Sequence, residues 1–136
     1  MNWYLKVWKQ YADFGGRARR RELWFFILFN YIAIFTIAFM SGFIGEFIGI
    51  GENFLNFIVG IYVLAVIIPA LAVQVRRLHD TGKSGFWILI AFIPLGSIVL
   101  LIFYCIQSDP GTNAWGRSPL EEGIPEEIDI NKFEEL

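Results

Sequence analysis

Residues 54–75 of the chain read FLNFIVGIYVLAVIIPALAVQV and contain no charged side chain. Two further stretches are equally free of charge, residues 23–44 and residues 86–106. The three stretches are 22, 22 and 21 residues long. As α-helices rising about 1.5 Å per residue, each would reach about 32 Å, which matches a bilayer's hydrocarbon core of roughly 30 Å. The distribution of charge therefore predicts three transmembrane helices.

The composition agrees with a membrane protein. Of the 136 residues, 56% are hydrophobic and 18% are charged, against about 45–50% and about 25% in soluble domains. This composition excludes a disordered chain, a collagen-like fibre and a basic nucleic-acid binder, so we expect no nucleic-acid partner. The single cysteine excludes a disulfide framework and a cysteine-rich zinc site. Because lipid cannot satisfy backbone polar groups, each span should be helical, and we expect an all-α membrane protein.

Prolines interrupt two of the three spans. Pro69 lies in the second span and Pro94 in the third, and membrane helices commonly tolerate such a residue as a kink. For the third span, a kinked helix over residues 86–106 competes with a true break within residues 93–97, IPLGS. We expect the kinked helix, because a fully re-entrant hairpin would need more residues than this span has. The first span is too long an apolar run for a cleaved signal peptide.

Basic residues indicate the orientation. Nine of the eleven Lys and Arg residues lie in residues 1–22 and 76–85, which three spans would place on one side. The positive-inside rule assigns that side to the cytoplasm. The C-terminus would then lie outside, whereas a broken third span would return it to the cytoplasm.

Residues 2–14 predict an N-terminal interfacial amphipathic helix. At 100° per residue, one face carries aromatic and apolar side chains and the other carries lysines and amides. Such a helix suits the headgroup region, although it could also dock on the protein's own spans. We expect the five tryptophans to be interface anchors: Trp3, Trp8, Trp24, Trp87 and Trp115.

A basic segment follows this helix. After Gly15 and Gly16, which allow a turn, come Arg17, Arg19, Arg20 and Arg21. These arginines are either a topology anchor on anionic headgroups, each contributing about 1 kcal/mol, or a binding site for a lipid headgroup or another anion. Both interpretations place an anion next to this segment.

Residues 76–87, RRLHDTGKSGFW, are the densest polar stretch between spans. Gly82 suits the end of the second helix and Ser84 suits an N-cap of the third. Asp80 could pair with its neighbours Arg76 and Arg77 or with the arginines at 17–21. The stretch is either a capped turn or a site for a ligand or proton built from Arg77, His79 and Asp80. The candidate functional residues are Arg17, Arg19, Arg20, Arg76, Arg77, His79, Asp80, Lys83 and Ser84.

Other sites find little support. The GKS sequence at residues 82–84 lacks the earlier glycine of a phosphate-binding loop, since Arg77 stands there. His79 is the single histidine, which leaves too few ligands for zinc. We therefore expect no metal, no cofactor and no catalytic residues.

Three segments together resemble the domain of unknown function 805 family. They are residues 13–24, which include GRxRRxExW; residues 76–87, RRLHDTGKSGFW; and residues 111–119, GxNxWGxxP. The resemblance covers residues 3–119 and implies a multi-pass protein of the bacterial cytoplasmic (inner) membrane. The resemblance does not imply any particular biochemical activity for this chain. Residues 108–119 otherwise predict a series of turns, and residues 120–136 an acidic, solvated and partly disordered tail.

The chain is therefore divided into a basic N-terminal segment (1–22), a membrane domain (23–119) and the tail. We expect a non-enzymatic membrane component that acts through anionic lipid or a partner protein. One alternative is the subunit of an oligomeric transporter or channel, although no span carries an ionisable acid, base or histidine. Another is a membrane-surface enzyme that uses His79 and Asp80.

Overall fold

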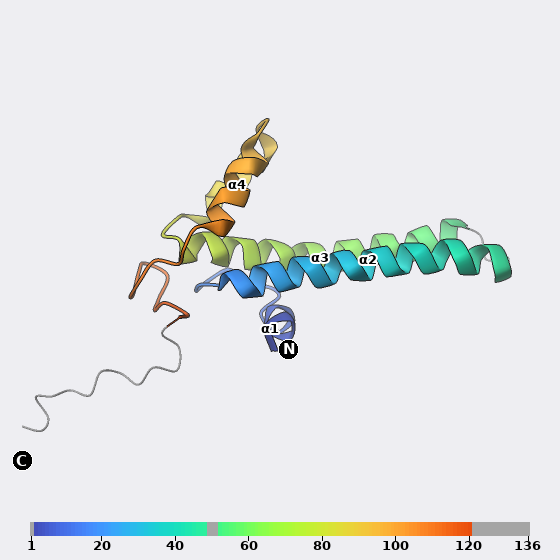
Figure 1. Cartoon of the computed structure of the whole chain (residues 1–136), viewed down its shortest axis with the longest axis horizontal. Coiled ribbons are helices and arrows are strands. Elements are labelled where there is room, and N and C mark those ends of the chain that lie inside the picture. Colours follow the sequence, from blue (N-terminus) through green and yellow to red (C-terminus); the bar gives the residue numbers. More distant parts are fainter. Residues whose placement is uncertain (1, 49–51, 121–136) are drawn as a thin grey trace, which may run out of the picture.

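The computed structural model describes residues 2–48 and 52–120 (Figure 1). The described elements are helices α1 (Asn2–Lys9), α2 (Arg20–Ile48) and α3 (Glu52–Asp80), a 3₁₀ helix η1 (Gly85–Phe92) and α4 (Gly96–Cys105). Within the described ranges there is no strand beyond an isolated bridge between Asn113 and Gly116. The expected all-α class is confirmed.

The two long helices, α2 and α3, lie side by side along the long axis of the molecule (Figure 1). Each contains a segment long and apolar enough to cross a membrane, Arg20–Phe43 and Asn56–Asp80. Large apolar side chains remain exposed along both helices, such as Phe35 at 72% and Phe57 at 65%. Exposure on this scale is unfavourable in water and suits a lipid environment. Helix α3 continues through Pro69 without a break, as expected.

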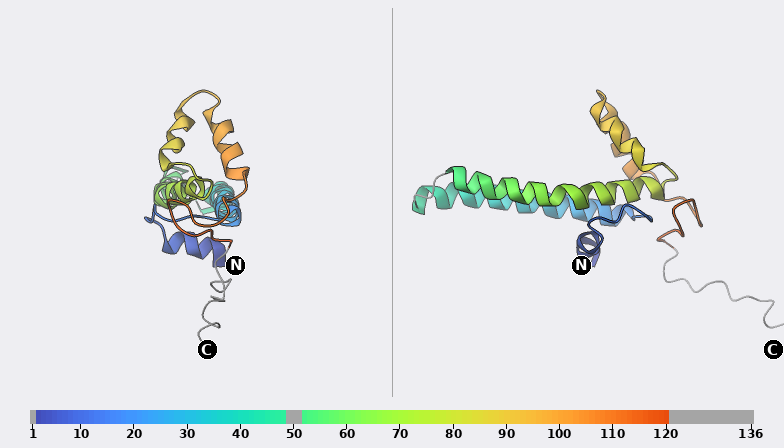
Figure 2. Two further views of the ribbon diagram at one scale, coloured as in Figure 1. Left: turned by 90° about the vertical axis from the view of Figure 1, so that its left-hand side faces the viewer. Right: turned by 180° about the vertical axis from the view of Figure 1, so that it is seen from behind.

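The predicted third span is broken, so the expectation of one kinked helix over residues 86–106 is wrong. The chain forms η1, reverses at residues 93–95 and returns as α4, and the two arms make a hairpin that leaves the α2–α3 pair (Figure 2). Pro94 explains the stop, because proline disfavours helical geometry in the preceding residue; Ile93 is extended, with φ −92° and ψ 139°. Leu95 then adopts a left-handed φ of 66°.

A glycine lets the two arms meet. A Cβ added to Gly96 would lie 1.7 Å from the carbonyl oxygen of Ile90, so no other residue fits there without movement. At about 2.0 Å per residue, the eight residues of η1 reach about 16 Å, and the ten of α4 about 15 Å. Each arm is therefore about half as long as a membrane-spanning helix.

The hairpin brings the chain back to the end at which it started. The segment after α4, residues 107–120, is called the returning segment. The backbone N–H of Asp109 donates to the Asp80 carbonyl oxygen at 2.9 Å, so this segment lies beside the end of α3. A continuous third span would carry residues 107–120 to the opposite face from residues 17–21 and 76–85, so this expectation is wrong. The acidic tail from residue 121 onward, and residues 49–51 between α2 and α3, lie outside the described residues.

Helix α1 packs on the same end and runs across the α2–α3 pair (Figure 2). Val7 is fully buried, and the rings of Tyr4 and Trp8 lie 5.8 and 6.4 Å from that of Phe26. The Lys6 ammonium pairs with the buried Glu22 carboxylate at 3.0 Å. We call this end, where the start of α2, the end of α3 and the segment after α4 meet, the polar end. It contains a core of buried side chains: Val7, Ala18, Leu23, Phe26, Val73, Leu78, Leu100 and Tyr104.

Candidate functional site

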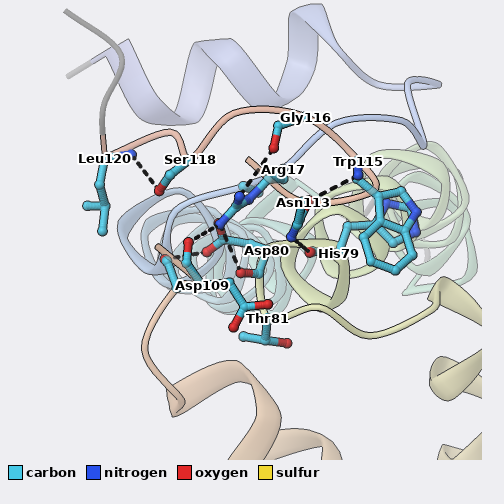
Figure 3. Close-up of polar contacts among 12 residues, drawn as sticks. Arg17, His79, Asp80, Thr81, Asp109, Asn113, Trp115, Gly116, Ser118 and Leu120 are labelled. Carbon is cyan, nitrogen blue, oxygen red and sulfur yellow. Dashed lines mark hydrogen bonds and ion pairs between the residues drawn. The ribbon is translucent and has the colours of Figure 1, made fainter. Parts of the chain in front are cut away.

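A buried carboxylate organises the polar end of the molecule. Asp80 is the last residue of α3 and is fully buried. A negative charge is unfavourable at a helix C-terminus, where the dipole is already negative. Two guanidinium groups compensate. Arg17 Nε donates to Oδ1 at 2.9 Å (Figure 3), and Arg77 Nη1 donates to Oδ2. We call these three residues the arginine–aspartate cluster.

The pairing resolves the two alternatives for Asp80. It binds one arginine from its own helix and one from the basic segment at 17–21. The Ser108 hydroxyl also donates to Oδ2. With both oxygens engaged by three donors, this carboxylate is poorly placed to accept a proton from a substrate.

Arg17 joins three parts of the chain through its remaining donors. Nη1 donates to the carbonyl oxygens of Gly111 at 2.8 Å and Gly116 at 3.2 Å. Nη2 donates to the carbonyl oxygens of Asp80, at 3.3 Å, and of Asp109. One side chain therefore fixes the start of α2, the end of α3 and the returning segment to each other.

Arg77 performs the corresponding role for the hairpin. Its Nε donates to the carbonyl oxygen of Tyr104 at 3.2 Å, and Nη2 donates to that of Ile106. The last carbonyl groups of a helix have no intrahelical donor, so the guanidinium caps the end of α4. This contact holds the returning arm against α3.

His79 and Trp115 form a stacked pair beside the cluster. Their ring centroids are 4.5 Å apart and their planes differ by 10°. The Asn113 side-chain amide donates to the His79 carbonyl oxygen at 2.9 Å, and the backbone N–H of Trp115 donates to Asn113 Oδ1 at 3.0 Å (Figure 3). Gly116 completes the turn with a φ of 118°, which favours glycine. Trp115 thus packs on the protein's own histidine.

A second group of arginines lies around an open cavity. Arg19 is half-buried, and Arg20 and Arg21 are exposed. These three side chains line a cavity of about 430 Å³, and its other walls are Gln107, Ser108 and Leu120. Helix α2 begins at Arg20, so the positive end of its dipole adds to the field of the guanidinium groups. We call this cavity the basic pocket.

The remaining candidates lie apart from both groups. Arg76 is buried and donates through Nη1 to Gln10 Oε1. Lys83 Nζ approaches the Thr81 carbonyl oxygen at 3.3 Å and lies 4.8 Å from the centre of the Phe103 ring. Ser84 caps η1 as expected, since its hydroxyl accepts from the N–H of Phe86 at 3.4 Å.

The other tryptophans have different surroundings. Trp8 packs on α2, whereas Trp24 and Trp87 are 39% and 45% exposed. The side chain of Trp3 lies outside the described part of the structure. No group of three or more His, Cys, Asp or Glu residues that could hold a metal lies within the described ranges.

The sequence interpretation missed the contribution of the returning segment. Ser108, Asp109 and Asn113 all contact the cluster or its neighbour His79. A continuous third span would have placed them across the membrane. Their signal was the dense run of turn residues in this segment, together with its motif glycines and asparagine.

The three segments that carry the sequence motifs therefore converge at one end of the fold. A family model described as "Protein of unknown function (DUF805)" matches residues 11–117. Over 120 residues, the chain is 44% identical to inner membrane protein YhaH of Escherichia coli (strain K12), which covers 88% of this chain and 97% of that protein.

Two further relatives extend the comparison. Inner membrane protein YhaI of the same organism is 42% identical over 120 residues, which cover 88% of this chain and 96% of YhaI. The uncharacterized protein YiiR is 31% identical over 93 residues, which cover 65% of this chain and 53% of YiiR. No solved structure matches. Since the family match extends over both long helices, the hairpin and the site, the chain belongs to the DUF805 family.

Proposed function

We propose that the protein is a non-enzymatic component of the bacterial inner membrane that binds anionic lipid headgroups in the basic pocket. In this proposal α2 and α3 cross the bilayer, α1 lies in the headgroup region, and the η1–α4 hairpin enters only part of the way. The polar end faces the cytoplasm, as the positive-inside rule requires for its basic residues.

Several observations support this placement. The relatives YhaH and YhaI are named inner membrane proteins. Helix α1 runs across the α2–α3 pair, which is the orientation of a helix parallel to a membrane surface (Figure 2). Trp24 and Trp87, near the starts of α2 and η1, are exposed. Arms of about 15 Å are too short to cross a hydrocarbon core of roughly 30 Å.

The basic pocket is the observation that carries the proposal. In the arginine–aspartate cluster, guanidinium charge is balanced by a buried carboxylate. Within the described residues no such partner pairs with Arg20 or Arg21. Guanidinium groups bind phosphate oxygens in a bidentate manner, and a helix N-terminus adds backbone N–H donors. A volume of about 430 Å³ is sufficient for a lipid headgroup.

The test is lipid retention by the purified full chain. We would replace both exposed arginines, Arg20→Gln and Arg21→Gln, and measure bound phosphatidylglycerol by native mass spectrometry. We expect at least a fivefold loss of retained phosphatidylglycerol and no change for phosphatidylcholine.

A matched control removes the same charge elsewhere. The variant Lys9→Gln, Lys83→Gln also loses two positive charges, and neither residue lines the basic pocket. We expect it to retain phosphatidylglycerol within twofold of the wild type. Equal losses in the two variants would mean that the lipid responds to net charge alone, which contradicts a specific pocket.

A further inference from the structure

A second cavity lies against the stacked pair of His79 and Trp115. Its volume is about 530 Å³, and it shares no lining residue with the basic pocket. Its walls include aromatic and aliphatic side chains from four parts of the chain: Phe14, Val75, Phe86, Ile88, Leu89 and Trp115. Small-molecule sites are commonly apolar cavities of about 300–1,000 Å³ with a few polar groups. We call this cavity the His79 pocket.

The histidine presents one nitrogen to this cavity. His79 is only 8% exposed. Its Nδ1 lies 3.3 Å from the carbonyl oxygen of Gly16, which only accepts hydrogen bonds, so Nδ1 carries the proton. The neutral ring then has a lone pair on Nε2, and no described residue donates to it. Although the His79 side chain is mostly buried, Nε2 is left without a partner within the described part of the chain.

A glycine lies next to that nitrogen. A Cβ added to Gly85, which lines the cavity, would lie 3.4 Å from His79 Nε2 and 2.7 Å from Val75 Cγ1. Nε2 therefore lies next to a lining position that carries no side chain. A larger residue at position 85 would stand against Nε2 and crowd Val75.

The surroundings define the ligand's chemistry. Phe86 and Leu89 at the cavity are 81% and 55% exposed, so in a bilayer they contact lipid and a ligand can enter from the membrane phase. No Lys, Arg, Asp or Glu lines the cavity, which disfavours a charged headgroup. Aromatic walls favour a flat ring, and the free acceptor selects a hydrogen-bond donor.

We propose that the His79 pocket binds a neutral, membrane-dissolved amphiphile whose flat apolar ring carries a hydroxyl group. The hydroxyl donates to Nε2 of His79, and the ring lies against Trp115 and Phe14. This site is separate from anion binding in the basic pocket.

The single histidine makes a direct test possible. With ¹⁵N-labelled histidine, every imidazole signal of the full chain in phosphatidylcholine nanodiscs comes from His79. We would titrate with 4-octylphenol and with 4-octylanisole, which has a similar body but no O–H. We expect the phenol to move the Nε2 resonance upfield and to bind about fivefold more tightly than the anisole, the effect of one added hydrogen bond.

Two glycine variants locate the effect. Gly85→Ala places a methyl group next to Nε2, and we expect it to abolish the response to the phenol. Gly60→Ala is the matched control, because a Cβ there meets nothing within 4 Å, and it should respond like the wild type. The comparison of the two ligands on the wild type stands even if Gly85→Ala does not fold.

Three results would overturn the proposal. They are equal affinity for the phenol and the anisole, an Nε2 signal that ignores the phenol, and a free-state spectrum in which Nε2 rather than Nδ1 bears the proton. Equal affinity would instead indicate a purely apolar cavity. None of these results affects retention of phosphatidylglycerol by the basic pocket, so the two proposals fail separately.

Discussion

Arg17 and Arg20 are three residues apart and have opposite surroundings. Arg17 is buried, pairs with Asp80 and donates to backbone carbonyl groups of the returning segment. Arg20 is exposed at the mouth of a cavity. A run of arginines before a membrane helix therefore contains two kinds of residue. One kind completes the fold, and the other remains available to an anion.

The buried contacts around Asp80 and His79 explain why the three motif segments have the residues that they do. Residues 13–24, 76–87 and 111–119 are far apart in sequence, yet side chains from all three meet at Asp80 and His79. Their pattern is explained by the junction of two long helices, a hairpin and a returning loop. A shared motif in this fold therefore need not indicate a catalytic site.

The largest loss of stability is expected from removing the negative charge of Asp80. Asp80→Asn leaves two buried guanidinium groups without a counter-charge, and breaking a buried pair in this way costs about 3–5 kcal/mol. Thermal unfolding in detergent should show a strongly lowered Tm or loss of the folded protein. Asp13→Asn, at an exposed position, is the control and should unfold like the wild type. An unaffected Asp80→Asn protein would mean that the cluster does not hold the fold together.

The same substitution at two arginines tests the comparison directly. Arg17→Lys keeps the charge but loses the planar fork that reaches several acceptors at once, so we expect a loss of about 2–3 kcal/mol. Arg20→Lys should leave Tm unchanged, because its side chain is exposed and forms no hydrogen bond or ion pair within the described fold. Denaturant unfolding of the two variants measures the difference, and equal stability would remove the distinction between the regions.

A smaller effect is expected at the turn that positions Trp115. Gly116 has a φ of 118°, and an alanine there should cost about 1–2 kcal/mol in strain. Gly42→Ala in α2 is the control: a Cβ there meets nothing within 4 Å, and alanine is the better helix former. The two changes should thus move Tm in opposite directions. A neutral Gly116→Ala would show that the returning segment adapts without strain.

The long helices could be predicted from the sequence, whereas the hairpin could not. The charge-free stretches at 23–44 and 54–75 lie within α2 and α3, each of which is long and apolar enough to cross a membrane. Pro69 and Pro94 give the same local signal, yet one lies within a helix and the other at a reversal. At Pro94 the two arms also meet, with Gly96 against the backbone of Ile90, and this packing distinguishes the reversal from the unbroken helix at Pro69.

The candidate site was predicted in part for the same reason. Both partners of Asp80 were among the alternatives, because arginines and a carboxylate on one side of a membrane attract each other. Ser108 and Asn113 were missed, since a continuous third span separates them from α3. The incorrect assumption of a continuous third span therefore left the residues after α4 out of the predicted site.

The smallest change in Tm is expected from substitutions in the basic pocket. This change should depend on whether anionic lipid is present. The Arg20→Gln, Arg21→Gln variant should unfold at the wild-type Tm in phosphatidylcholine, because neither side chain supports the buried cluster. Added phosphatidylglycerol should raise the Tm of the wild type, since a ligand that binds only the folded state stabilises it by mass action. The Tm of the variant should rise less on addition of phosphatidylglycerol.

This difference in Tm between the wild type and the variant should shrink as the salt concentration is raised, because exposed charges are screened over a Debye length of about 10 Å at 0.1 M. The Arg17–Asp80 pair is buried and should be insensitive to salt. If the variant were already less stable without anionic lipid, Arg20 and Arg21 would belong to the structural region, and the division between the two sets of arginines would be lost.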